Sequence, residues 1–65
     1  MKTVIYFEDD GIVEHVKTVS GAIPLSVGDT VYIEGEKYED VVVWKIGYDI
    51  SCDELVIHTC DESRI

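Results

Sequence analysis

Residues 2–18 read KTVIYFEDDGIVEHVKT, and this stretch decides the fold class. On both sides of the central Asp-Asp-Gly the residues are mostly β-branched or aromatic, which is typical of half-buried strands. Residues 9–11 fit a turn, because Asp tolerates a tight backbone and Gly adopts positive φ. The stretch therefore predicts a β-hairpin with strands at 2–8 and 12–18.

The register of this hairpin depends on the length of its turn. A three-residue loop with Gly11 in the left-handed conformation pairs Glu8 with Ile12 and stacks Val4 on Val16. A register shifted by one residue also fits the sequence, and it would move each side chain to the other face.

Outward from the hairpin, the chain predicts further strands at 29–34, 38–50 and 55–60, separated by tight turns. Gly47 inside the long strand indicates a bulge or a sharp bend. No segment holds an apolar 3.6-residue period long enough for a helix. Five to six short strands favour a small antiparallel β-barrel, formed by residues 1–65 as one domain.

Residues 19–28 form the one extended loop of the prediction. They include Pro24, the only proline, and two of the five glycines of the chain. A flexible linker would be more polar, so we expect this loop to pack across an open end of the sheet. Its apolar residues are Ala22, Ile23, Leu25 and Val27.

Residues 24–31, Pro-Leu-Ser-Val-Gly-Asp-Thr-Val, are followed by Tyr-Ile-Glu-Gly-Glu-Lys-Tyr at 32–38 and a valine-rich strand. This arrangement resembles small SH3-like barrels, in which a Pro-x-x-x-Gly-Asp loop leads into a strand, a tight turn and a second strand. The layout of the whole chain is similar to that of short bacteriophage-encoded proteins. The resemblance implies an SH3-like barrel of phage origin; it does not imply an activity, because one fold serves many functions.

Fourteen Asp and Glu residues against five Lys and Arg give a formal net charge of −9. This charge repels a phosphate backbone, so we expect no direct binding of nucleic acid. The carboxylates gather in the predicted turns and the tail, at 8–10, 34–40, 53–54 and 61–62. Two interpretations remain open: acidic loop tips that keep a small barrel soluble, or carboxylates that imitate a row of phosphates on one face.

Metal binding and catalysis find little support in the sequence. Cys52, His58 and Cys60 follow a C-x5-H-x-C pattern, whereas structural zinc sites usually carry pairs such as C-x2-C. We expect free thiols and no metal or cofactor. Neither His15 nor His58 has a nucleophile motif nearby, and no glycine-rich phosphate loop is present, so we expect no enzyme.

The aromatic residues give two interpretations of the long strand. Alternation places Trp44 on one face with Val42 and Ile46, which favours Trp44 as a core residue. The alternative is an exposed aromatic stripe that docks a protein, because aromatic side chains are favoured interface anchors. The candidate partner-binding residues are Tyr32, Tyr38, Trp44 and Tyr48, with an acidic rim of Glu34, Glu36, Glu39 and Asp40.

The expected function is a non-enzymatic, acidic interaction module that binds a host or virion protein with a basic surface. One alternative is a charge mimic of nucleic acid that inhibits a host defence or DNA-binding enzyme. A second is a structural subunit that self-associates, as a homodimer or ring, through the face of Val41–Val43. No apolar run approaches the roughly 20 residues of a membrane span, and no signal peptide is recognisable, so we expect a cytoplasmic protein that binds no membrane.

Overall fold

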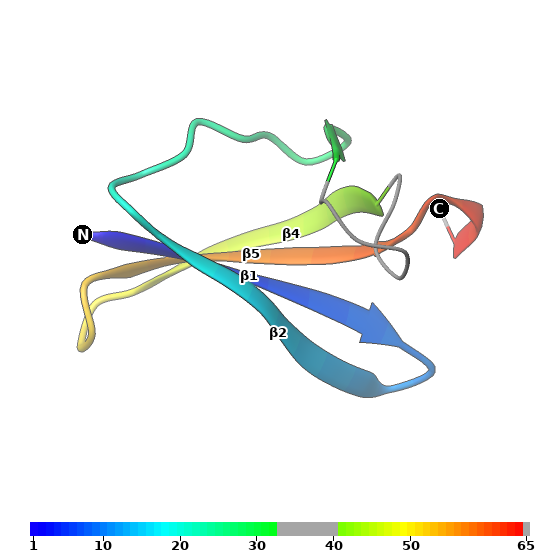
Figure 1. Cartoon of the computed structure of the whole chain (residues 1–65), viewed down its shortest axis with the longest axis horizontal. Helices are drawn as coiled ribbons and strands as arrows, with labels where there is room; N and C mark the ends of the chain where they lie inside the picture. Colours follow the sequence, from blue (N-terminus) through cyan, green and yellow to red (C-terminus); the bar gives the residue numbers. More distant parts are fainter. Residues whose placement is uncertain (33–40, 65) are drawn as a thin grey trace.

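The computed structural model describes residues 1–32 and 41–64, and this part of the chain is all-β. Five strands form one sheet in the order β2-β1-β5-β4-β3, which curls into an open half-barrel (Figure 1). The predicted all-β class is confirmed. The bounds are β1 Lys2–Asp9, β2 Ile12–Ser20, β3 Thr30–Val31, β4 Val41–Asp49 and β5 Glu54–Asp61, followed by the 3-10 helix η1, Glu62–Arg64.

The hairpin of β1 and β2 turns over two residues, Asp10 at φ 49° and Gly11 at φ 80°. Positive φ at both positions is the signature of a type I′ turn, whose twist matches that of the flanking strands. Ile12 therefore pairs with Asp9 and not with Glu8. The predicted three-residue loop is wrong by one residue, because Asp10 adopts the left-handed conformation that the prediction reserved for glycine.

A bulge in β2 changes the hairpin register a second time. Ile5 pairs with Lys17 and Tyr6 with His15, so Val16 is the extra residue. Val4 consequently lies opposite Thr18 and not Val16. Both Val16 and Lys17 then lie beside Ile5, on the same face of the sheet.

The β1–β2 hairpin and the β4–β5 hairpin join through β1 and β5, which lie inside the sheet. β1 pairs with β5 in parallel, in a register that runs from Lys2 opposite Glu54 to Glu8 opposite Cys60. The sheet is therefore mixed, and the prediction of an antiparallel barrel is wrong for this pair. β5 pairs antiparallel with β4 on one side and parallel with β1 on the other. The first and last strands of the sheet in chain order are therefore neighbours that run in the same direction.

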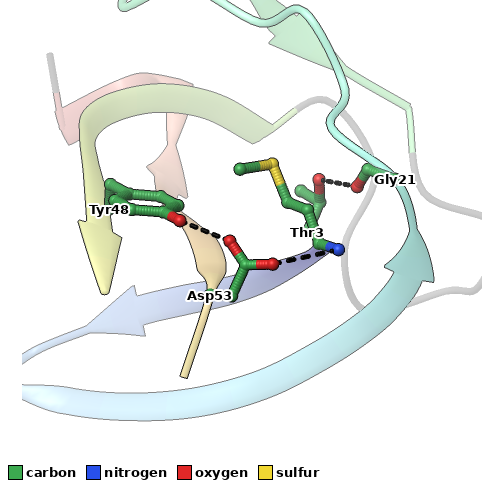
Figure 2. A network of polar contacts seen from close by, with 5 residues as sticks. Thr3, Gly21, Tyr48 and Asp53 are labelled. Atoms are coloured by element: carbon green, nitrogen blue, oxygen red, sulfur yellow. Dashed lines mark hydrogen bonds and ion pairs between the residues drawn. The ribbon is translucent and has the colours of Figure 1, made fainter. Parts of the chain in front are cut away.

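The central buried cluster lies on one face of the sheet, which we call the core face. Its centre is Ile5, Val43 and Ile57, against which Val16, Leu25, Val31, Ile46 and Leu55 pack. The segment between β2 and β3 crosses this face. The buried Thr3 hydroxyl donates to Gly21 O at 2.7 Å (Figure 2). It also accepts from Ile23 N at 3.1 Å. The predicted packing of this loop is confirmed for Ile23 and Leu25, whereas Ala22 and Val27 are exposed.

Of the predicted strand at 29–34 the structure describes residues 29–32, and β3 covers Thr30–Val31. Thr30 and Val31 pair with Val42 and Val41, and the Asp29 carbonyl extends the pairing by accepting from Val43 N at 2.9 Å. Gly28, at φ 99°, forms the turn that delivers the chain into β3. The predicted turn at 34–37 lies outside the described residues, as do residues 38–40 of the predicted long strand.

The long strand β4 carries its bulge at Trp44, three residues before the predicted position. Val43 pairs with Thr59 and Lys45 with His58, which leaves Trp44 as the extra residue, while Gly47 pairs regularly with Val56. Alternation therefore fails at Trp44, which is 41% exposed, and the interpretation of Trp44 as a core residue is wrong. Val41, Val42 and Val43 are all buried, so they leave no surface for the self-association expected there.

Candidate protein-interaction site

The structure separates the aromatic residues that the sequence grouped into one patch. Tyr32 follows β3 and is 81% exposed, Trp44 lies within β4, and Tyr48 lies near the far end of that strand. Trp44 and Tyr48 are four residues apart on a strand, or about 13 Å. Outside the described residues lie Glu34, Glu36, Tyr38, Glu39 and Asp40.

A different set of rings comes together on the face opposite the core face. Tyr6 stacks on His58 with ring centroids 6.1 Å apart, and it meets His15 edge-on at 5.9 Å. Trp44 lies 5.9 Å from His58 on the other side. These four rings, which we call the aromatic row, cross the sheet from β2 through β1 and β5 to β4: His15, Tyr6, His58 and Trp44.

Strand pairing explains why these rings meet. Tyr6 lies opposite both His15 of β2 and His58 of β5, so the three side chains share a face. The bulge in β4 then turns Trp44 toward His58. The sequence could not reveal this row, since Tyr6 and His58 become neighbours only through the parallel β1–β5 pair, and the histidines were weighed only for metal binding and catalysis.

Polar groups accompany the aromatic row at both histidines. Nδ1 of His58 lies 3.4 Å from Oε1 of Glu8, and that nitrogen is buried without a hydrogen bond to any described residue. A protonated imidazole there would form an ion pair with the carboxylate. At the β2 end, Nε2 of His15 and Oγ1 of Thr18 share a hydrogen bond of 2.7 Å. The row thus combines aromatic surface with polar side chains.

A second polar cluster lies at the turn between β4 and β5. Asp53, at φ 54°, accepts a hydrogen bond from the Tyr48 hydroxyl and lies 3.2 Å from the Met1 ammonium (Figure 2). The hydrogen bond and the ammonium hold the pKa of Asp53 below its ordinary value, and the same hydrogen bond raises the pKa of Tyr48. Because its hydroxyl donates to Asp53, the Tyr48 side chain is held at the β4–β5 turn and does not extend toward Trp44.

The same turn holds the group of side chains that comes nearest to a metal site. Asp49, Cys52 and Glu54 each place one ligand atom within 4.8 Å of the others. Asp49 Oδ1 accepts hydrogen bonds from the Ser51 hydroxyl and from the amides of Ser51 and Cys52, which hold the Asp49 pKa below its ordinary value. Asp49 therefore acts as a turn cap, and the cluster by itself does not define a metal site.

The C-x5-H-x-C residues do not assemble. Cys52 is exposed in the β4–β5 turn, whereas Cys60 is buried near the other end of β5, and the two are not joined by a disulfide. His58 and Cys60 share a face of β5, as alternation predicts, but Cys52 lies too far along the chain to join them.

Seven of the described Asp and Glu residues lie at the two ends of the sheet. The tip of the β1–β2 hairpin and the end of β5 lie at one end, and the β4–β5 turn lies at the other (Figure 1). A single row of phosphate-like charges does not form from these residues. The first end carries Asp9, Asp10, Asp61 and Glu62; the second carries Asp49, Asp53 and Glu54.

An apolar hollow of about 530 Å³ lies on the core face between β2 and the segment that ends in β3. Among the described strands, β2 and β3 are the two edges of the curled sheet, and the hollow lies between them. Lys17 contributes the one charged side chain among the described lining residues. The others are Ile5, Val16, Val19, Ile23, Val31 and Tyr32.

No helix in the described ranges 1–32 and 41–64 is long and apolar enough to cross a membrane. No family model, curated protein or solved structure matches this chain.

Proposed function

We propose that this chain is a non-enzymatic interaction module that binds a protein through the aromatic row. The observation that carries the proposal is the position of Trp44: a bulge holds its large ring on the surface, 41% exposed and 5.9 Å from His58. Aromatic side chains supply much of the energy of protein interfaces when they are desolvated by a partner. The four rings stand on paired strands that fix their backbone, so less conformational entropy is lost on binding.

The charge of the molecule supports a basic partner. A net charge of −9 attracts a positively charged protein over a distance and raises its association rate. Glu8 lies beside His58 within the row itself, at 3.4 Å. The partner we propose therefore carries basic side chains around an apolar or aromatic centre.

Residues 24–38 resemble part of small SH3-like barrels, and the layout of the chain resembles that of short phage proteins. We therefore extend the proposal to a phage-encoded protein. The open half-barrel is compatible with an SH3-like origin, although its mixed sheet departs from a purely antiparallel one. We place the protein in the cytoplasm of an infected host, where it acts on a host or virion protein. The alternative role as a charge mimic is weaker, because seven of the described Asp and Glu residues are divided between the two ends of the sheet.

The test is capture of proteins from a bacterial host lysate by three forms of the chain. Any protein captured by the wild type should be lost with Trp44→Ala, with a dissociation constant raised at least about tenfold. Tyr32→Ala is the matched control, since Tyr32 is more exposed but lines the hollow on the core face. Capture that survives Trp44→Ala and fails with Tyr32→Ala would refute the aromatic row as the binding surface.

A further inference from the structure

Gly47 lies inside β4 at a position where the fold does not call for a glycine. Its φ lies outside the left-handed region, it pairs regularly with Val56, and the bulge of this strand lies at Trp44. A Cβ added at Gly47 would have no described atom within 4 Å. Glycine inside a strand weakens it, and the usual reasons for one are a bulge, a bend or the close approach of a ligand. Of these reasons, the open space over Gly47 fits the last.

A shallow hollow of about 520 Å³ lies over Gly47 and Val56. Gly47 pairs with Val56 as Lys45 pairs with His58, and residues two apart on a strand share a face. The hollow is therefore on the same face as the aromatic row, and it extends from His58 toward the β4–β5 turn. It is separate from the hollow on the core face.

The two ends of this hollow carry opposite charges. Lys45 lies at the end next to the aromatic row, and Asp49 lies at the turn, two residues or about 7 Å beyond Gly47. The hydrogen bonds that lower the pKa of Asp49 keep it ionised; they end on Oδ1, and a carboxylate accepts through both oxygens. Between the charges, Gly47 and Val56 form an apolar floor, and Ile50, 84% exposed, forms an apolar rim. The hollow thus fits a side chain with an apolar stem and a positive head that points to the turn.

We propose that this hollow binds an arginine side chain of the basic partner, with the aliphatic stem over Gly47 and the guanidinium at Asp49. The inference rests on the proposed function, and it adds a second contact to that of Trp44. A guanidinium binds a carboxylate through two parallel N–H groups, and arginine is enriched at protein interfaces. Lys45 repels a cation at the row end of the hollow, so the guanidinium lies toward the turn.

The test uses Nα-acetyl-L-arginine amide as the probe and the free chain as the receptor. Amide chemical shifts of the isotope-labelled protein are followed up to about 100 mM probe at constant ionic strength, because a single side chain binds weakly. Saturable shifts are expected at Gly47, Asp49 and Val56. Nα-acetyl-L-citrulline amide, which carries a neutral urea in place of the guanidinium, should bind at least about fivefold more weakly. Equal shifts with both probes, or shifts as large at the β1–β2 hairpin tip as at Gly47, would overturn the proposal.

A larger residue at position 47 tests where the stem lies. Gly47→Val fills the hollow and favours the strand, so the dissociation constant of the arginine probe should rise at least about tenfold while the fold is retained. Circular dichroism and thermal unfolding check the fold. Unchanged probe binding by folded Gly47→Val would refute the site.

Charge substitutions test the orientation. Asp49→Asn keeps an oxygen for the turn but removes the charge, so the dissociation constant should rise about fivefold or more. Asp10→Asn is the matched control: it makes the same change in net charge at the other end of the sheet, and Asn tolerates the positive φ of that position. Lys45→Gln should strengthen binding, because it removes the repelling ammonium. Equal weakening by Asp49→Asn and Asp10→Asn, or weaker binding by Lys45→Gln, would contradict the proposed orientation.

The outcomes separate this inference from the proposed function. Loss of a captured protein with Trp44→Ala, together with no probe binding at Gly47, would refute the arginine site and leave the aromatic row. Probe binding that Gly47→Val abolishes, together with capture that survives Trp44→Ala, would support the arginine site and refute the row.

Discussion

Trp44 is the residue on which the functional argument depends, and one extra residue in β4 decides its position. Without the bulge, Trp44 would follow the alternation of Val42 and Ile46. With it, the ring turns to His58 and remains 41% exposed. This partly exposed position is the observation on which the proposed binding function rests.

At the same scale, the pair of Tyr48 and Asp53 predicts an effect of pH. Tyr48→Phe removes the hydroxyl that donates to Asp53, so the pKa of Asp53 should rise toward its ordinary value. Because the folded-state pKa of Asp53 is lowered, the pair stabilises the fold above the unfolded-state pKa, and this contribution is lost as pH falls through the folded-state pKa. NMR titration of the Asp53 carboxyl in both proteins measures the shift.

The stability difference between the wild type and Tyr48→Phe should accordingly be small, largest near neutral pH, and absent in acid below both pKa values of Asp53. Thermal unfolding at several pH values checks this. An equal pKa for Asp53 in the two proteins would show that the hydroxyl does not stabilise the carboxylate.

At the scale of elements, turn geometry and bulges fix the registers of both hairpins. Two residues with positive φ close the β1–β2 turn, and bulges at Val16 and Trp44 shift the pairing on either side of the β1–β5 pair. Bulges increase the local twist of a strand, which is consistent with the curled sheet (Figure 1).

Glycine substitutions test this turn. Gly11→Ala places a Cβ at φ 80°, which strains the backbone and should lower the free energy of unfolding by about 1 kcal/mol or more. Gly47→Ala is the matched control, since an added Cβ meets open space and the backbone is ordinary there, so it should be neutral or slightly stabilising. Urea unfolding of both variants measures the difference, and equal losses would contradict the type I′ turn.

Local patterns in the sequence were sufficient to predict four of the strands, because β-branched runs and turn residues mark them directly. The predicted strand at 55–60 is β5, Glu54–Asp61, extended by one residue at each end. Registers were not predictable, since one residue in a turn or a bulge changes them without altering composition. The aromatic row depends on the pairing of β1 with β5, which are distant in the sequence, so the sequence could not show that Tyr6 and His58 are neighbours. Tyr32 and Tyr48 were predicted as partner-binding residues, but they lie apart from Trp44.

At the scale of the whole molecule, the charge of −9 on 65 residues opposes compaction by self-repulsion. Added salt screens this repulsion, so the thermal midpoint should rise by a few degrees between low salt and about 0.5 M NaCl. The measurement should be made at low micromolar protein, where association between molecules contributes least. A midpoint that stays constant or falls would indicate that attractive pairs outweigh the net repulsion.

The central claim is that Trp44 is a surface anchor covered by a protein partner, and the chain has a single tryptophan to report on it. Acrylamide quenching of its fluorescence tests the claim directly, because this neutral quencher reaches exposed rings irrespective of charge. We predict ready quenching in the free protein and protection once a captured partner is bound. A tryptophan that is already shielded in the free protein, or that stays equally accessible in the complex, would contradict the account.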